Sequence, residues 1–176
     1  MKDDYLDNLG RAETDALYAR FTDGTLTQDQ ARAELPKVWD MTAHPGALLT
    51  PAQWRDLWQL AGHIRLYRDT HGGDILWEEI PRPSNAIPLY RSADDAFKTN
   101  PSWTTNEQLA WDWGYGDTVW VAEFTPERLL ATIDIKPSGE TEYVAYAEEL
   151  ELRVHRRKTQ FEPDPSDDCS DQCRVR

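Results

Sequence analysis

Apolar residues in the first third of the chain recur at the three- and four-residue spacing of amphipathic helices. Over residues 5–35 this stripe is interrupted by the turn signal Thr22-Asp23-Gly24. After the turn, Thr27 is a good N-cap residue and Gln30 stands three positions later, as in a capping box. The pattern therefore predicts two helices, the second running from Thr27 up to Pro36.

A further helix is predicted from a Thr-Pro pair. Thr50 suits an N-cap and Pro51 suits the first helical position. The apolar stripe that follows comprises Trp54, Leu57, Leu60, Ala61 and Ile64. Residues 70–85 contain the turn signals His71-Gly72-Gly73 and Pro81-Arg82-Pro83-Ser84-Asn85, which indicate a connector. We therefore expect a helical region over residues 1–80, and its apolar stripes predict that the helices complete the core.

Beyond the connector the hydrophobic period changes from 3.6 to 2, which is typical of strands. The strands are predicted at residues 86–91, 101–104, 118–124, 129–135, 142–147 and 150–154. A short helix is expected over residues 106–113, and residues 125–128 read as a turn between two strands. The pattern predicts one α+β domain, with a β core over residues 86–155 and a disordered tail over residues 156–176.

Composition narrows the classes of function. The 176 residues suit one domain, and 32 acidic against 19 basic residues give a formal net charge of -13. Such a charge opposes binding to a phosphate backbone, so we do not expect a nucleic-acid partner. Eight tryptophans are a high count for this length, and most of them are expected to be structural.

Neither a membrane anchor nor a metal site is predicted. The chain has no apolar run near the ~18 residues that a membrane span needs, and its first residues lack the apolar core of a signal peptide. We therefore expect a soluble protein without a membrane partner, located in the cytoplasm. Cys169 and Cys173 lie in the polar tail without a nearby histidine, so a reduced tail is favoured over a metal site.

Two carboxylates stand at the start of a late predicted strand. Glu140 and Glu142 follow Gly139, and residues two apart in a strand project to the same side, roughly 6–7 Å apart at Cα. Such a pair repels itself, and taken alone it is more typical of a solvated turn. Upstream, however, Arg91 ends one predicted strand and Ser102-Trp103-Thr104 forms another.

In this order and spacing, these three polar landmarks resemble the Arg/Ser-Thr-Ser/Glu class of ADP-ribosyltransferases. That NAD-using fold is shared by many bacterial toxins and phage-encoded enzymes. The resemblance covers roughly residues 88–154. It is carried by Leu89-Tyr90-Arg91, Ser102-Trp103-Thr104, Val119-Trp120-Val121-Ala122-Glu123, Glu127-Arg128-Leu129-Leu130-Ala131 and Gly139-Glu140-Thr141-Glu142-Tyr143-Val144. It implies a split β-sandwich onto which the helical N-terminal part packs.

The resemblance also implies a division of roles in a mono-ADP-ribosyltransferase that releases nicotinamide from NAD. Glu142 would stabilise the positive charge that builds on the ribose and hold a ribose hydroxyl. Arg91 would bind a phosphate of NAD. Ser102 would contact the nicotinamide ribose and support Glu142, with Thr104 beneath. Tyr90 would stack on nicotinamide, although an alternating strand aromatic is more often core.

Glu140 occupies the position that meets the acceptor in this family. A glutamate there resembles the arginine-modifying subgroup, in which a carboxylate orients and deprotonates the nucleophile. A protein is the expected acceptor, while related enzymes modify other acceptors or hydrolyse NAD.

Two departures from the family pattern stand out. Ser92 replaces the usual glycine after the arginine, and residues 106–117 offer no basic side chain, which leaves Arg68 or Arg82 to assist Arg91.

Two other functions are consistent with the sequence. One is a catalytically silent module that binds NAD or ADP-ribose with the same fold. The other is an interaction protein whose acidic, tryptophan-rich face binds a basic host surface. The complete set of Arg91, Ser102 and Glu142 favours the enzyme over the silent module, because a decayed site would be expected to lose at least one of them.

Overall fold

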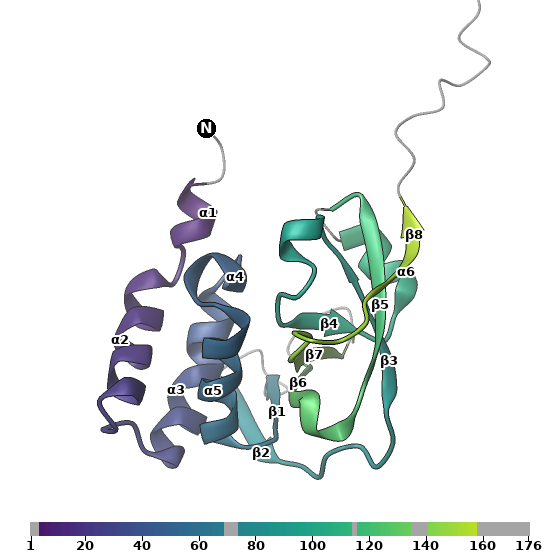
Figure 1. Ribbon diagram of the computed structural model, residues 1–176. Coiled ribbons are helices and arrows are strands. Elements are labelled where there is room, and N and C mark those ends of the chain that lie inside the picture. Colours follow the sequence, from purple (N-terminus) through teal and green to yellow (C-terminus); the bar gives the residue numbers. More distant parts are fainter. Residues whose placement is uncertain (1–3, 69–73, 114–115, 135–140, 158–176) are drawn as a thin grey trace, which may run out of the picture.

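The computed structural model describes residues 4–68, 74–113, 116–134 and 141–157. Five helices come first and lie together beside the strands (Figure 1). They are α1 (Asp4–Asn8), α2 (Arg11–Thr22), α3 (Gln28–Met41), α4 (Pro45–Leu48) and α5 (Pro51–Ala61). The predicted capping box at Thr27 is confirmed, with Thr27 accepting from the Gln30 N–H. The predicted N-cap at Thr50 is also confirmed, and it forms a capping box in which Thr50 accepts from the Gln53 N–H.

The second predicted helix does not stop at Pro36. Helix α3 continues through Pro36 to Met41, although proline lacks the N–H of one ladder hydrogen bond. Leu35, Val38 and Trp39 are all buried in the core. Because this apolar face needs the helix to continue, tertiary packing outweighs the local cost of the proline.

The connector prediction for residues 70–85 is also wrong in part. Gly62, with φ at 85°, ends α5, and Ile64 begins strand β1 (Ile64–Arg68) instead of continuing the helix. Strand β2 (Ile75–Glu79) lies within the expected connector and pairs with β1 in antiparallel register. Its alternation is hard to see in the sequence because the strand is short and its burial is partial. The helical region therefore ends at residue 61, and residues 64–68 and 75–79 belong to the sheet.

The remaining elements follow the predicted order closely. They are β3 (Ile87–Ser92), the 3₁₀ helix η1 (Asp95–Phe97), β4 (Ser102–Thr104), α6 (Glu107–Trp113), β5 (Thr118–Phe124), η2 (Pro126–Arg128), β6 (Leu129–Asp134), β7 (Glu142–Ala145) and β8 (Arg153–Arg157). The chain is thus an α+β protein with an eight-stranded sheet in the order β2-β1-β6-β7-β4-β3-β5-β8. Strand β1 runs parallel to β6, and the other neighbouring strands pair in antiparallel fashion.

The sheet has a weak joint between β4 and β3. Tyr90 and Thr104 form the single residue pair between these strands, whereas every residue of β3 is paired with β5. The joint divides the sheet into a first block, β2-β1-β6-β7-β4, and a second block, β3-β5-β8. The ring of Trp103 in the first block packs edge-on against Phe124 in the second, 4.8 Å between centroids. Apolar side chains therefore hold the two blocks together where hydrogen bonds do not.

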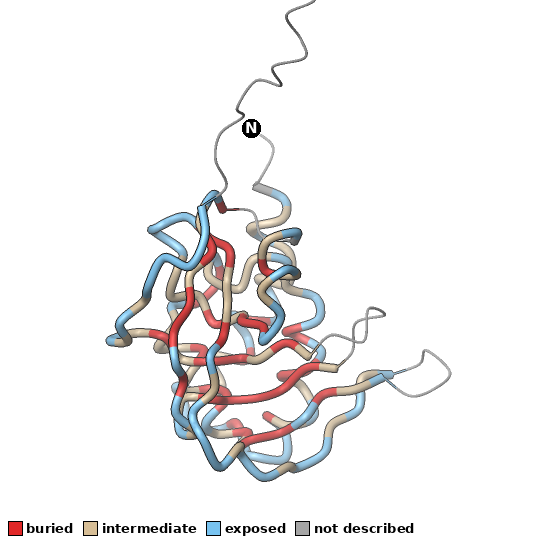
Figure 2. Tube along the Cα trace, turned by 90° about the vertical axis from the view of Figure 1, so that its right-hand side faces the viewer, coloured by how far each residue is buried: buried red, intermediate tan, exposed pale blue. Residues whose placement is uncertain are grey.

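Two hydrophobic cores stabilise this arrangement, and β6 contributes to both. One core joins α2, α3 and α5 to the first block and includes Leu130 and Ile133 of β6. The other lies between the two blocks and includes Leu129 of β6, Leu89 of β3 and Phe124 of β5. Figure 2 shows buried residues following the strands while outer turns and loops are exposed. In the described part of the chain, the helices, the first block and the second block thus lie on one another as successive layers.

The last strand is shifted from its predicted position. Strand β8 covers Arg153–Arg157 instead of residues 150–154, and every residue in it is exposed. It pairs with the edge of β5, with an irregularity between Val119 and Trp120, and the Arg156 guanidinium lies 3.7 Å from the Trp111 ring centroid. The predicted disordered tail therefore does not begin at residue 156; residues beyond 157, with Cys169 and Cys173, lie outside the described part.

Strand β1 is entered through a buried histidine. His63 Nδ1 donates to the Ile80 carbonyl at 3.1 Å, and the Ile80 N–H donates to the His63 carbonyl, so the hairpin of β1 and β2 is closed at this end. Burial lowers the pKa of His63 from its ordinary value of 6.5, against the opposing effect of that hydrogen bond. Folding therefore favours the neutral ring.

This shift predicts an acid-sensitive stability. Below pH 6.5 the unfolded chain binds a proton that the folded ring resists, so the contribution is full above that pH and is lost as the pH falls through the lower folded pKa. We expect urea denaturation to give a smaller free energy of unfolding at pH 5.5 than at pH 7.5. His63→Asn, which keeps a donor for Ile80, should reduce that difference; an unchanged difference would contradict the assignment to His63.

Among the described residues, no helix combines the length and apolar character needed to cross a bilayer.

Candidate functional site

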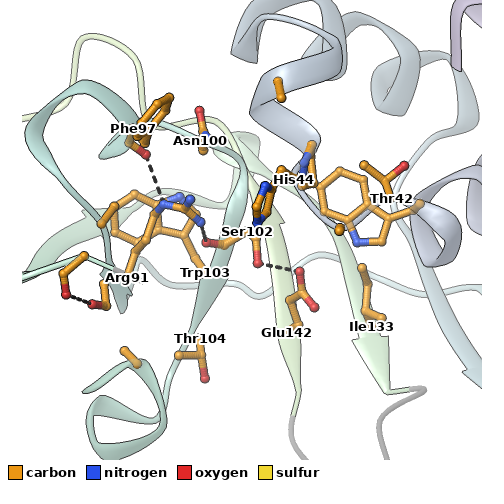
Figure 3. A pocket seen from close by; sticks show the side chains of 18 of the residues that line it. Thr42, His44, Arg91, Phe97, Asn100, Ser102, Trp103, Thr104, Ile133 and Glu142 are labelled. Carbon is orange, nitrogen blue, oxygen red and sulfur yellow. Dashed lines mark hydrogen bonds between the residues drawn. The ribbon is translucent and has the colours of Figure 1, made fainter. Parts of the chain in front are cut away.

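Three landmarks from the sequence come together on one cavity of about 1000 Å³ (Figure 3). Strand β3 supplies Arg91, β4 supplies Ser102 and Thr104, and β7 supplies Glu142. Antiparallel pairing of β4 with β7 places Thr104 opposite Glu142. The weak joint between the blocks then brings Arg91 beside β4. Residues separated by as many as 51 positions are therefore neighbours because of sheet topology.

Glu142 and Ser102 are in direct contact. The Ser102 hydroxyl donates to Glu142 Oε1 at 2.5 Å, and Glu142 is only 7% exposed. Hydrogen bonds from a hydroxyl to a carboxylate are short and strong. The serine therefore fixes the orientation of a buried carboxylate that borders the cavity, and this contact is the one that the resemblance implies for Ser102 and Glu142.

Arg91 is a cation held in a defined orientation. Its Nη1 donates to the Ser102 carbonyl at 2.7 Å and its Nε donates to the Phe97 carbonyl at 3.2 Å. Burial lowers its pKa to about 10, partly offset by the negative charge of Glu142. The guanidinium still carries its charge at neutral pH. Because it has five N–H donors and these two contacts use two, it keeps donors for an anion in the cavity.

Thr104 and Tyr90 also border the cavity, but each has another contact. The Thr104 hydroxyl accepts from the Asn106 N–H at 3.0 Å and so helps to begin α6. The Tyr90 ring packs edge-on against His155 of β8, 5.1 Å between centroids. Because side chains alternate along a strand, Tyr90 and Arg91 leave β3 on opposite faces. Stacking of Tyr90 on a ligand stays a prediction.

Trp103 is structural, as expected for most of the tryptophans. Its ring is 1% exposed and lies in the core between the two blocks. Glu140, by contrast, lies outside the described residues, so the structure does not place the second carboxylate of the pair.

Ser92 stands where the family that the sequence resembles often has glycine. Its hydroxyl is buried and donates to the Gly116 carbonyl at 2.9 Å. A Cβ atom on Gly116 would lie 2.1 Å from the Ala93 carbonyl carbon, so this close approach requires glycine. The serine therefore fastens the end of β3 to the segment before β5, and the glycine that this region needs lies at position 116.

Of the two assisting arginines suggested by the sequence, Arg68 lines the cavity and Arg82 is not among its described lining residues. Arg68 Nη2 forms an ion pair with Asp40 at 3.1 Å. Both side chains are partly exposed, so this pair can exchange for a ligand at modest cost. The cavity thus has a second cation on the side of the helical layer.

Sequence reasoning missed the wall that the helices contribute. Asp7 of α1, Thr42 and His44 of the loop before α4, and Pro45 of α4 all line the cavity. Asn100 before β4 approaches α4 so closely that a Cβ atom on Gly46 would overlap its side-chain amide. The helices therefore complete the core, as expected, and also enclose the site. No local motif marks these residues, because their role arises from contacts between distant segments.

The cavity is lined by both signs of charge. Arg91 and Arg68 are its cations, while Asp7, Asp40, Asp94 and Glu142 are its carboxylates. In the described part of the chain, no cluster of three or more His, Cys, Asp or Glu side chains is arranged to hold a metal ion. Chemically, a fixed carboxylate beside a fixed guanidinium can stabilise a developing cation and bind an anionic group in the same ligand.

Comparison of the chain with models of protein families, with curated proteins and with solved structures finds no match.

Proposed function

We propose that this protein is an NAD-dependent mono-ADP-ribosyltransferase that transfers ADP-ribose from NAD to an acceptor and releases nicotinamide. The observation that carries the proposal is the contact between Ser102 and Glu142 on the cavity that Arg91 also borders. The fold is proposed to be the split β-sandwich of these enzymes. The single residue pair between β3 and β4, with a hydrophobic core between the two blocks, supports that assignment.

The chemistry uses the charge of Glu142. When the bond between nicotinamide and ribose breaks, its electron pair leaves with nicotinamide and positive charge develops on the ribose. A carboxylate fixed beside the ribose stabilises the transition state, in which that charge develops, more than it stabilises bound NAD. The activation barrier is therefore lower. Ser102 keeps the carboxylate from rotating, because its hydroxyl holds Oε1. Preorganisation of this kind is what distinguishes a catalytic carboxylate from a solvated one.

The anionic part of NAD is assigned to the arginines. Arg91 can offer its remaining N–H donors to a phosphate, and Arg68 can do the same if it exchanges its partner Asp40. A volume of about 1000 Å³ is at the upper end of the usual range for ligand pockets, which suits an extended dinucleotide. A protein arginine is the acceptor that Glu140 would favour.

Incubation of the purified protein with NAD tests the proposal, with nicotinamide release and transfer of labelled ADP-ribose to a lysate as the readouts. Release of nicotinamide is expected. A protein that binds NAD without releasing nicotinamide would be the silent module, and one that shows neither would overturn any role for NAD.

Arg91→Lys is expected to raise the KM for NAD by about tenfold or more. The planar guanidinium can bond the Ser102 and Phe97 carbonyls and a phosphate at the same time, and the compact ammonium of lysine cannot. Steady-state kinetics of nicotinamide release measure this effect. Arg65→Lys is the matched control, since Arg65 is a partly exposed arginine that pairs with Asp134 and Glu78 and does not line the cavity. Equal KM values for wild type and Arg91→Lys would show that Arg91 does not bind NAD.

A further inference from the structure

An imidazole and a carboxylate form a pair on the helical wall of the cavity. Asp7 Oδ1 accepts from His44 Nδ1 at 2.8 Å, and both residues line the cavity that Arg91, Ser102 and Glu142 border. His44 comes from the loop between α3 and α4, on the helical side of the view in Figure 3. The pair therefore belongs to the same cavity as the proposed NAD site but to its other wall.

Hydrogen bonds from neighbouring residues hold the backbone around the pair in place. Arg11 Nη2 donates to the backbone carbonyls of Asp7 and Ala47, which ties α1 to α4 around His44. On the other side, Trp54 Nε1 donates to the Pro45 carbonyl at 2.9 Å, so the residue after His44 is fixed to α5. A single surface ion pair would not need this support. The helical layer thus holds the imidazole in one place relative to the strands.

The pair also sets the chemistry of the ring. Because a carboxylate accepts from Nδ1–H, it favours the tautomer in which Nε2 is the basic nitrogen. The His44 side chain is 29% exposed, so a second substrate can reach it through the cavity.

We propose that His44, oriented by Asp7, is the general base that activates an oxygen nucleophile of the ADP-ribose acceptor, an inference that rests on the proposed function. As nicotinamide leaves with the electron pair of its bond to ribose, the acceptor oxygen forms a bond to the same ribose carbon. The acceptor O–H gives its proton to His44 Nε2, and the imidazolium later returns that proton to solvent. An alcohol gives an O-linked ADP-ribose, and water gives free ADP-ribose.

The chemistry of the base distinguishes this acceptor from the arginine that Glu140 would favour. A protonated guanidinium has no free lone pair and must lose its proton before it attacks, and imidazole is a poor base for that step. A hydroxyl oxygen already has lone pairs and needs to lose its proton only as its bond to ribose forms. The charged groups that border the cavity with His44 are Asp7 of α1, Asp40 of α3, Arg68 of β1, Arg91 of β3, Asp94 before η1 and Glu142 of β7. These groups include both positive and negative charges, so the cavity does not require its acceptor to be charged and can bind a neutral one.

Two substitutions separate a base from a structural contact. In His44→Asn the amide nitrogen replaces Nδ1 and can still donate to Asp7, but nothing replaces Nε2. In His44→Gln the amide replaces Nε2 and the contact with Asp7 is lost. The assay supplies NAD with methanol, a small alcohol that needs no binding site of its own. It measures nicotinamide, ADP-ribose and O-methyl ADP-ribose, and agmatine in a parallel reaction reports transfer to a guanidinium.

Wild type is expected to form both ADP-ribose and O-methyl ADP-ribose and to leave agmatine unmodified. Both His44 variants should lose about 10²-fold in these products, with the KM for NAD changed less than threefold, and added imidazole should restore part of the rate. Asp7→Asn, which keeps an acceptor for Nδ1 but not the charge, should lose about tenfold and serves as a second test if a His44 variant does not fold.

The failures are distinguishable. Wild-type rates in His44→Asn with a loss only in His44→Gln would show that the pair is structural, and preferred transfer to agmatine would show a guanidinium acceptor. Either result overturns this inference while NAD cleavage still supports the proposed function. Absence of nicotinamide release from wild type under all conditions overturns both.

Discussion

Glu142→Gln is expected to lower the rate of nicotinamide release by about 10²- to 10³-fold. The substitution keeps the size of the side chain, and an amide oxygen can still accept from the Ser102 hydroxyl that now holds Oε1 at 2.5 Å. In the proposed transferase, what disappears is the negative charge beside the ribose of NAD. Because that charge acts on a cation that exists only in the transition state, the loss should appear in kcat rather than in the affinity for NAD.

Single-turnover nicotinamide release measures the chemical step, and calorimetry measures NAD binding in the same variant. Glu123→Gln is the matched control, because Glu123 is an exposed glutamate of β5 that does not line the cavity. It should leave both quantities within twofold of wild type.

The same experiment distinguishes the three functions that the sequence allowed. A silent module predicts NAD binding without turnover, equal in wild type and Glu142→Gln. An acidic interaction protein predicts no NAD binding and capture of a basic partner that weakens as salt increases. The transferase would be contradicted by a Glu142→Gln variant that releases nicotinamide at the wild-type rate.

Much of the fold could be predicted because its signals are local. Thr27 and Thr50 indicate helix starts together with side chains three residues away, and β5 is indicated by its β-branched and aromatic residues. Local signals fail where tertiary contacts decide. Helix α3 continues past Pro36 because its last turns are needed in the core, and β8 exists because the edge of β5 is there to pair with it.

The candidate site shows the same division. Arg91, Ser102 and Glu142 were identified from their order along the chain, since each stands at a predictable place on a strand. His44 and Asp7 could not be found in this way, because both lie outside the strands and outside residues 88–154, which the resemblance covers. What brings them to the cavity is the packing of the helical layer on the first block of the sheet. The helices that looked like simple core elements thus shape the second wall of the site.

Trp54 connects the packing of the helical layer to the site, because it is buried in that layer and donates to the carbonyl of Pro45, which lines the cavity. Trp54→Ala is expected to lower the free energy of unfolding by about 3–5 kcal/mol. The side chain is fully buried, and its ring meets Trp39 edge-on at 5.1 Å between centroids. Removing the ring leaves a cavity between α3 and α5 that neighbouring side chains can fill only in part. Against a typical total stability of about 5–15 kcal/mol, this loss is large. Urea denaturation followed by circular dichroism measures it.

Trp54→Phe separates the packing from the hydrogen bond. Phenylalanine retains most of the buried ring but cannot donate to the Pro45 carbonyl, so its stability cost should be smaller than that of Trp54→Ala. Because Pro45 follows His44, the loss of this bond should loosen the helical wall and lower transfer to methanol more than it changes the KM for NAD. A fully active Trp54→Phe protein would show that the wall keeps its position without this bond, and a Trp54→Ala protein as stable as wild type would contradict the core described here.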